Sequence, residues 1–156
     1  MLPFAAYGQG PVLISPFKMA RVAAAIAAGG MVPQGRWITD SSNPRRDAPK
    51  RILDADVAQV VARGMRSVVT GGTGQRAMAG LDIKVAGKTG TAQVEEGAPH
   101  SWFAGFAPYD AQPEGRIAFA VVMEHGGYGS LAAAPIAREL VEAARDLGII
   151  TKQEKK

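Results

Sequence analysis

The stretch that decides the fold is Lys88-Thr89-Gly90-Thr91-Ala92-Gln93. It follows the alternating run 82–87, and two further strand-like runs come after it, at residues 101–107 and 116–123. Threonine favours strands, lysine is tolerated at the edge of a sheet, and glycine lets another backbone approach closely. We therefore interpret the stretch as an edge strand that offers a ligand one lysine, two hydroxyls and exposed backbone groups.

A phosphate-binding loop is an alternative for the same residues, because Gly87-Lys88-Thr89 resembles the end of such a loop. That loop requires a glycine at position 82, which is Asp82 here, and a helix that begins at the lysine. Residues 93–97 are instead typical of a strand end followed by a turn. We therefore reject the phosphate loop.

The composition indicates one domain with a substantial core, since 47 % of the 156 residues are hydrophobic. We place this domain at residues 1–150 and a basic tail at 151–156. The net charge of +4 comes partly from residues 45–51 and partly from the tail, and aromatic residues do not alternate with these basic ones. Nucleic-acid binding is therefore not expected. With two His and no Cys, we expect no metal site, and no cofactor.

Helix signals occur on both sides of the strands. Ser15-Pro16 predicts an N-cap and a first helical turn, with a helix that continues to about Ala28. Asp54 predicts the cap of a second helix, which ends at the glycines 71–74. A third helix is predicted from about residue 132 to residue 147.

The remaining segments are predicted as follows. A short extended piece covers 36–39, a loop covers 40–49, and residues 75–81 form a connector. The near-continuous apolar run 117–123 predicts a strand that is buried on both faces. Three consecutive strands joined by short turns should pair antiparallel, with helices on one or both faces, which is an α+β fold.

Short motifs distributed along the chain resemble the C-terminal half of the transpeptidase domain of penicillin-binding proteins. They run from about residue 7 to residue 147, and their order and spacing are more specific than any one of them. The motifs are Gly8-Gln9-Gly10, Ser15-Pro16-Phe17-Lys18-Met19-Ala20, Gly29-Gly30, Gly72-Thr73-Gly74, Ala86-Gly87-Lys88-Thr89-Gly90-Thr91-Ala92-Gln93, His100-Ser101-Trp102-Phe103-Ala104-Gly105-Phe106-Ala107-Pro108 and Ala134-Pro135-Ile136. The resemblance is closer to the monofunctional, peptide-crosslinking group than to the bifunctional glycosyltransferases. It implies part of a serine β-lactamase/transpeptidase-like fold.

The family carries a serine nucleophile in Ser-x-x-Lys, a Ser-x-Asn and a Lys-Thr-Gly strand. The resemblance implies acyl transfer from D-alanyl-D-alanine peptides, a reaction that β-lactams intercept. It also implies that Lys88 supplies positive charge near the substrate carboxylate and that the hydroxyls of Thr89 and Thr91 bind this carboxylate. The backbone N–H of Thr91 would form half of the oxyanion hole, so Lys88 and Thr91 are the expected catalytic residues. Gly90 would leave the strand open to the substrate.

Two literal matches to the first two family motifs are interpreted as coincidental. Ser15-x-x-Lys18 lies where the family has a helix start well after its nucleophile, so an N-cap is the expected role of Ser15. Ser41-x-Asn43 follows Lys18 after only one helix and a turn, and the sequence Ser41-Ser42-Asn43-Pro44 is typical of a turn. We therefore expect the nucleophile to lie outside this chain, and the chain alone to be inactive.

The expected partners are the peptidoglycan stem peptide, β-lactams and the N-terminal half of the same transpeptidase domain. The resemblance implies an extracytoplasmic location, anchored to the membrane through that N-terminal part. A D,D-carboxypeptidase or serine β-lactamase relative shares the strand motif and remains an alternative. A non-catalytic penicillin-recognition or scaffold module of the cell-wall machinery is a second alternative, which would lack the upstream Ser-x-x-Lys.

Overall fold

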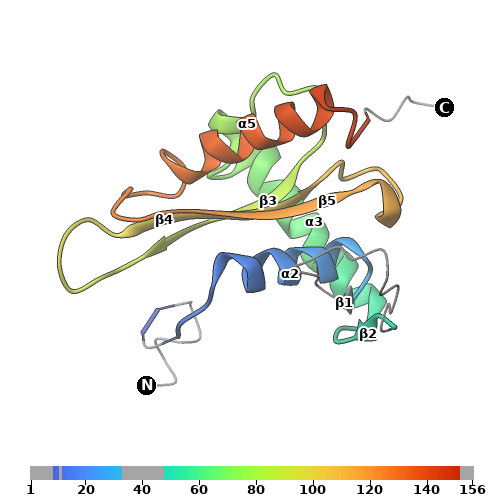
Figure 1. The fold of residues 1–156 in the computed structure, drawn as a ribbon, viewed down its shortest axis with the longest axis horizontal. Helices are drawn as coiled ribbons and strands as arrows, with labels where there is room; N and C mark the ends of the chain where they lie inside the picture. Colours follow the sequence, from blue (N-terminus) through green and yellow to red (C-terminus); the bar gives the residue numbers. More distant parts are fainter. Residues whose placement is uncertain (1–8, 11, 33–47, 152–156) are drawn as a thin grey trace, which may run out of the picture.

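The computed structural model describes residues 9–10, 12–32 and 48–151. These residues form an antiparallel sheet with helices on both sides (Figure 1), which confirms the α+β prediction. In chain order, the elements are α2 (Pro16–Ala27), β1 (Met31–Val32), β2 (Lys50–Arg51), α3 (Ala55–Gly71), α4 (Gln75–Met78), β3 (Ala86–Ala92), β4 (His100–Ala107), the 3₁₀ helix η1 (Pro113–Gly115), β5 (Ile117–Met123) and α5 (Ala133–Asp146).

The main sheet has the strand order β3-β4-β5, and both pairings are antiparallel. Phe103 of β4 lies between Thr89 of β3 and Val121 of β5. Strand β3 is therefore an edge strand, as the sequence predicts. The Phe103 ring lies so close to Gly87 that a Cβ there would be 2.3 Å from it, which explains a glycine at this position of the strand.

Helices cover the two faces of the sheet unequally. On one face, α2 and α3 pack through a small cluster of buried residues, Ala27, Met65, Ala86 and Phe106. On the other face, α5 packs over a larger core that includes Phe103, Phe119 and Val141 (Figure 1). Of this chain's aromatic residues, Phe103 and Phe106 are therefore buried on opposite sides of the same strand, as alternation requires.

The predicted ends of α2 are confirmed. The Ser15 hydroxyl accepts a hydrogen bond from the backbone N–H of Lys18 at 3.3 Å, and Pro16 is the first helical residue. Gly29 and Gly30 follow the helix with φ of +61° and +91°, the left-handed region that glycine tolerates best. Ser15 is thus an N-cap, which is the role that the sequence predicts for it.

Several elements differ from the sequence predictions. The predicted connector 75–81 contains α4, whose Met78 is buried in the larger core. Strands β1 and β2 pair through two residues each, and η1 lies in the short connection between β4 and β5. These pieces are too short for a periodic pattern, so tertiary packing decides them. The predicted extended piece 36–39 and most of the loop 40–49 lie outside the described residues.

Strand β5 is not buried on both faces, so that prediction was wrong for the described residues. Only Phe119 of this strand is buried, and the strand forms the second edge of the sheet. Helix α3 also leaves apolar side chains uncovered, because its buried positions are Ala58, Met65 and Val69. The exposed set on this helix is Val57, Val60 and Val61. In the described ranges, no helix combines the length and the apolar character that crossing a bilayer requires.

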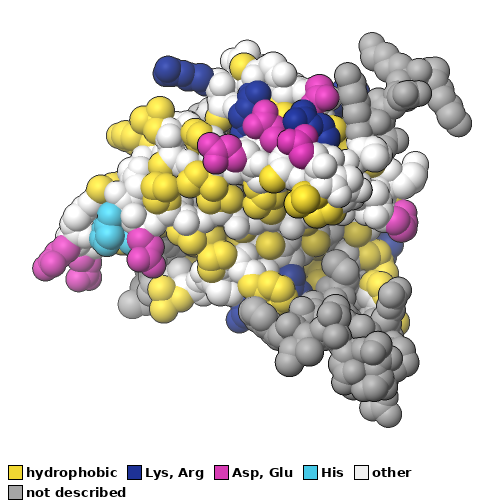
Figure 2. Space-filling model, turned by 45° about the horizontal axis from the view of Figure 1, so that its top comes forward, with side chains coloured by type: hydrophobic (Ala, Val, Ile, Leu, Met, Phe, Trp, Pro, Cys, Tyr) yellow, Lys and Arg dark blue, Asp and Glu magenta, His cyan; other side chains and the backbone are white. Residues whose placement is uncertain are grey.

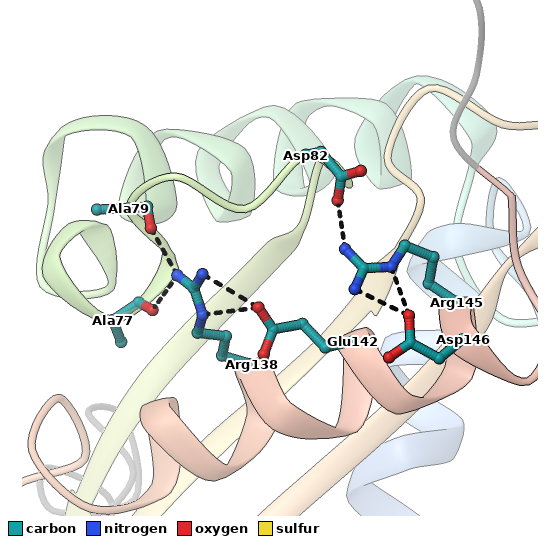
Figure 3. A network of polar contacts seen from close by, with 7 residues as sticks. All are labelled: Ala77, Ala79, Asp82, Arg138, Glu142, Arg145 and Asp146. Carbon is teal, nitrogen blue, oxygen red and sulfur yellow. Dashed lines mark hydrogen bonds and ion pairs between the residues drawn. The ribbon is translucent and has the colours of Figure 1, made fainter.

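Arg138, a residue of α5, fixes the C-terminal end of α4 against α5 (Figure 3). Its guanidinium donates hydrogen bonds to the carbonyls of Ala77 and Ala79 and forms an ion pair with Glu142, one turn along α5, at 3.1 Å. The carbonyls at the C-terminal end of a short helix have no helical partners, and this arginine supplies two of them with a charged donor.

Arg145 holds the segment that leads into β3 (Figure 3). It forms ion pairs with Asp82 at 2.8 Å and with the adjacent Asp146 at 2.9 Å. The hydrogen bonds to Asp146 and Asp82 raise the pKa of Arg145 above its ordinary value. Together with Arg138, this residue fixes the polypeptide that precedes β3, so the start of the edge strand is positioned by α5.

Candidate functional site

The candidate site lies along the free edge of β3. The carbonyl of Thr91 points away from β4, because it accepts a hydrogen bond from the side-chain amide of Gln9 at 2.9 Å. The oxygen of the same Gln9 side-chain amide accepts a hydrogen bond from the backbone N–H of Gln93 at 3.2 Å. In an antiparallel strand, the N–H and C=O of one residue point to the same side. The N–H of Thr91 therefore also faces the free edge, where an extended ligand could reach it.

The four predicted site residues lie on this one strand, but their side chains divide between its faces. The register places Lys88 and Gly90 on the α2 side, and Thr89 and Thr91 on the α5 side. Lys88 is exposed, and its ammonium group donates a hydrogen bond to the carbonyl of Thr89 at 2.6 Å. Because that carbonyl faces the free edge, the positive charge of Lys88 lies at the edge as well.

Gly90 is enclosed from two directions. On the α2 side, a Cβ at this position would lie 3.1 Å from the Cβ of Trp102. On the other side, Gly129 packs directly against the strand: a Cβ on Gly129 would lie 2.4 Å from the Gly90 carbonyl oxygen and 2.6 Å from that of Trp102. The loop between β5 and α5 therefore rests on the backbone of the candidate site, and this contact requires a glycine at position 129, whereas a side chain at position 90 would meet Trp102 on the opposite face.

A buried serine holds this loop in place. The hydroxyl of Ser101 accepts a hydrogen bond from the N–H of Ala133 at 2.9 Å and donates to the carbonyl of Tyr128 at 3.2 Å. Ser101 is completely buried, so both bonds are shielded from water. Phe103, the next residue on the same face of β4, belongs to the core, whereas Trp102 is half-buried beside Gly90.

Thr89 is the most buried of the predicted site side chains, with 7 % of its surface exposed. Its hydroxyl oxygen lies 2.6 Å from that of Thr73, which follows the C-terminus of α3. This is a short hydroxyl–hydroxyl hydrogen bond. The Thr89 hydroxyl is thus positioned by a residue from another element.

Two histidines lie beside the turn between β3 and β4, and Nδ1 of His125 is 3.0 Å from the carbonyl oxygen of Ala98 in that turn. The backbone N–H of His125 donates to Nδ1 of His100 at 3.0 Å, and the rings meet edge to face with centroids 4.9 Å apart. His125 has a φ of +53°, which is uncommon for a residue with a side chain. Figure 2 shows histidine between acidic side chains at the narrow end of the molecule. The sequence indicates only a polar strand start at His100.

Three residues of the site were not assigned a role from the sequence: Gln9, Thr73 and Gly129. Gln9 and Thr73 lie within the glycine-flanked motifs Gly8-Gln9-Gly10 and Gly72-Thr73-Gly74. The flanking glycines were the available signal, because glycines around a polar residue often mark a close backbone approach. Gly129 lies in a glycine-rich loop whose partner strand the sequence does not reveal.

Comparison with known proteins agrees with this arrangement. The family described as penicillin binding protein transpeptidase domain matches residues 3–142. Peptidoglycan D,D-transpeptidase MrdA of Haemophilus influenzae is 31 % identical over 161 residues, which cover 86 % of this chain and 24 % of that protein. Peptidoglycan D,D-transpeptidase PbpA of Mycobacterium tuberculosis is 30 % identical over 154 residues, which cover 88 % of this chain and 30 % of that protein.

A solved structure shows the same fold. Penicillin-binding protein A from M. tuberculosis, in an imipenem acyl-enzyme complex, superposes with a TM-score of 0.75 at 32 % identity, over 92 % of this chain and 33 % of that one. The fold and the edge-strand site thus define a domain of the serine β-lactamase-like type. The chain belongs to the penicillin-binding protein transpeptidase family. It spans 24 % and 30 % of the lengths of the two curated relatives described above.

Proposed function

We propose that this chain carries the substrate-binding edge strand of a peptidoglycan D,D-transpeptidase. The observation that carries this proposal is the outer edge of β3, which presents the N–H of Thr91 beside the ammonium group of Lys88, while the C=O of Thr91 accepts from the side-chain amide of Gln9. An extended peptide with a terminal carboxylate fits such an edge, since it can add as a further strand and place its anion near the lysine. The names of the two relatives support this class of reaction.

Each residue of the strand has a specific role in this proposal. The N–H of Thr91 donates to the oxyanion that forms when the peptide carbonyl is attacked, and one such donor lowers the barrier by roughly 3–4 kcal/mol. The ammonium group of Lys88 and the hydroxyls of Thr89 and Thr91 bind the terminal carboxylate. Gly90 keeps the strand free of a side chain where the peptide approaches.

The reaction proceeds in two steps. A serine oxygen attacks the carbonyl of the penultimate D-alanine, the peptide C–N bond breaks, and the leaving nitrogen takes up the proton that the serine hydroxyl gives up, so the terminal D-alanine departs as a free amine. The amine of a second stem peptide then attacks the resulting ester, which forms a new peptide bond, and a proton lost by this amine returns to the released serine oxygen. In a β-lactam, the amide that breaks lies in a ring, so the leaving nitrogen stays attached and the acyl-enzyme persists.

The serine nucleophile is proposed to come from a segment other than these residues. Ser15, the literal match to the family's serine, has its hydroxyl engaged at the N-terminus of α2. Ser41 and Asn43 lie outside the described residues. The limited coverage of the relatives, 24 % and 30 % of their lengths, agrees with a nucleophile elsewhere in a longer protein.

The N-terminal half of the same domain is the proposed partner of the uncovered apolar surfaces. The first of these surfaces is the Val57–Val61 side of α3, and the open edge of β5 adds unpaired backbone N–H and C=O groups that a further strand could bind. Figure 2 also shows apolar side chains in a band beside the charged residues of α5, a helix on which Leu140 is 37 % exposed. Large apolar surfaces of this kind mark sites of protein contact. Since stem peptides belong to the cell wall, the proposed location is extracytoplasmic, with a membrane anchor outside this chain.

A charge-removal experiment tests the proposed function. The full-length protein is incubated with a fluorescent penicillin, and the rate of acylation is followed by intact mass. Lys88→Met should slow acylation by at least roughly tenfold, because it removes a charged donor from the carboxylate. Lys84→Met is the matched control: it removes a lysine from the segment before β3 whose ammonium group pairs with Asp110 at 2.6 Å.

The outcomes separate the alternatives. Equal acylation of Lys88→Met and the wild type would refute the role of the strand, and a wild type that is never acylated would favour a scaffold module. Incubation of the enzyme with a stem pentapeptide and an acceptor amine distinguishes the two enzyme classes. A crosslinked product identifies a transpeptidase, whereas release of D-alanine alone identifies a carboxypeptidase.

A further inference from the structure

We propose that Thr73 is a positioning residue for substrate recognition, because its hydroxyl orients the hydroxyl of Thr89 toward the carboxylate of the substrate. This inference rests on the proposed function, in which Thr89 binds that carboxylate. The contact that carries it is the 2.6 Å distance between the two hydroxyl oxygens, which joins residues 16 positions apart in the sequence.

The number of protons on the Thr73 and Thr89 hydroxyls favours a hydrogen-bond relay, in which Thr73 donates to Thr89 and Thr89 donates to the substrate. Each threonine hydroxyl has one proton, and the bond between the two oxygens uses only one of these protons. If Thr73 donates to Thr89, the Thr89 proton remains available for an anion beside β3. An anion that accepts from Thr89 selects this direction, and two successive hydroxyl bonds to a charge strengthen each other. Without Thr73, the largely buried Thr89 hydroxyl loses the partner that aligns it.

The end of α3 holds Thr73 in this position. The N–H groups of Gly72 and Gly74 both donate to the carbonyl of Val68, at 3.1 and 3.0 Å. A Cβ on Gly72 would lie 2.9 Å from the Val68 Cα, so this turn requires glycine. A Cβ on Gly74 would lie 3.6 Å from the ring of Phe103, which is the cross-strand neighbour of Thr89. The turn is therefore packed against the part of the sheet that carries Thr89.

Thr70, in the last turn of α3 just before the turn that carries Thr73, offers a matched control. Thr70 is exposed, and among the described residues its hydroxyl donates only to carbonyls of its own helix, those of Arg66 at 3.2 Å and Ser67 at 3.4 Å. Thr70→Val and Thr73→Val remove the same group three residues apart. Only the second substitution removes a contact to β3.

The experiment compares a penicillin with its neutral methyl ester on the full-length protein. The measured quantity is the second-order acylation rate constant for each compound, with the melting temperature of every variant. Thr73→Val should lower the rate for the acid by roughly three- to tenfold, the range expected for one hydrogen bond, and should leave the ester rate unchanged. Thr73→Ser, which keeps the hydroxyl, should restore the rate for the acid. Thr70→Val should match the wild type with both compounds.

Two results would overturn the inference while the proposed function stands. One is an equal loss for acid and ester in Thr73→Val, which would indicate a structural role only. The other is an unchanged acylation rate for the acid in Thr73→Val, together with a loss in Thr89→Val that affects the acid and not the ester. By contrast, an unchanged preference for the acid in Thr89→Val would refute the carboxylate role of Thr89 and the relay with it. A wild type that neither compound acylates would refute the proposed function itself, and the inference that depends on it.

Discussion

A single methyl group on Gly129 should disable the site without touching any proposed catalytic side chain. In Gly129→Ala, the new Cβ would lie 2.4 Å from the carbonyl oxygen of Gly90, 2.6 Å from that of Trp102 and 2.9 Å from the Gly90 nitrogen. All three neighbours are backbone atoms of paired strands, so none can move as a rotating side chain would. The φ of Gly129 is not in the left-handed region, so alanine is disfavoured by the close contacts alone.

The size of the effect follows from these distances. Ordinary contact between a carbon and its neighbour begins near 3.4 Å, so the loop and β3 must separate by about 1 Å. Overpacking of this kind typically costs about 1–3 kcal/mol of unfolding free energy. A displacement of about 1 Å at a catalytic group can also cost roughly a hundredfold in rate. The N–H of Thr91, the next residue along the strand, would be displaced with Gly90.

The assay is β-lactam acylation of the full-length protein, measured beside the melting temperature. Gly115→Ala is the control, because this last residue of η1 also lacks a left-handed φ, and the nearest atom to its new Cβ, that of Ala111, is 3.7 Å away. Gly129→Ala should acylate roughly a hundredfold more slowly, and Gly115→Ala should match the wild type. If Gly129→Ala acylates at the wild-type rate, the loop does not determine the position of β3, and this reasoning is wrong.

Three further predictions concern single groups. Thr91→Val in the full-length protein should slow acylation roughly ten- to a hundredfold at an unchanged melting temperature, since a hydrogen bond to a charged group contributes about 1.5–3 kcal/mol. A wild-type rate of acylation would mean that this hydroxyl does not bind the carboxylate. The isolated 156-residue chain should form no covalent adduct with a fluorescent penicillin, and a mass increase on Ser15 would contradict its assignment as an N-cap. Gly64 lies inside α3, and beyond the helix's own backbone no atom lies within 4 Å of a Cβ added there. Gly64→Ala should therefore raise the unfolding free energy by about 0.5–1 kcal/mol in chemical denaturation. A loss of stability would indicate an unrecognised contact.

Helix α3 shows what a periodic sequence pattern predicts and what it leaves to packing. The apolar residues of α3 recur at helical spacing, which predicts the helix correctly but not which side is buried. The structure buries Ala58, Met65 and Val69 and leaves Val57 and Val60 exposed. The reason is that periodicity specifies an apolar side of a helix, whereas the packing partners decide which part of it is covered. The same holds for β5, whose apolar run predicts burial that the described residues do not supply.

In the candidate site, too, some features follow from the sequence and others only from the packing of distant elements. That Lys88 to Thr91 lie on an edge strand follows from local preferences, because threonine and glycine favour an extended, approachable backbone and turn residues bound each strand. That the side chains of Lys88 and Thr89 lie on opposite faces follows from alternation alone. The contact between Thr73 and Thr89 follows neither from local preferences nor from strand alternation, since Thr73 lies beyond α3 and Thr89 lies on β3.

The sequence by itself determined the order of the long helices and the three main strands, the antiparallel pairing and the edge position of the Lys-Thr-Gly strand. Each depends on periodicity, capping residues and short connections, which act within a few residues of one another. Only the tertiary structure decided the presence of α4, the packing of Gly129 on Gly90 and the bond between Thr73 and Thr89. These features bring together residues that are distant in the chain, and the contacts that fix them exist only once the sheet and its helices have packed.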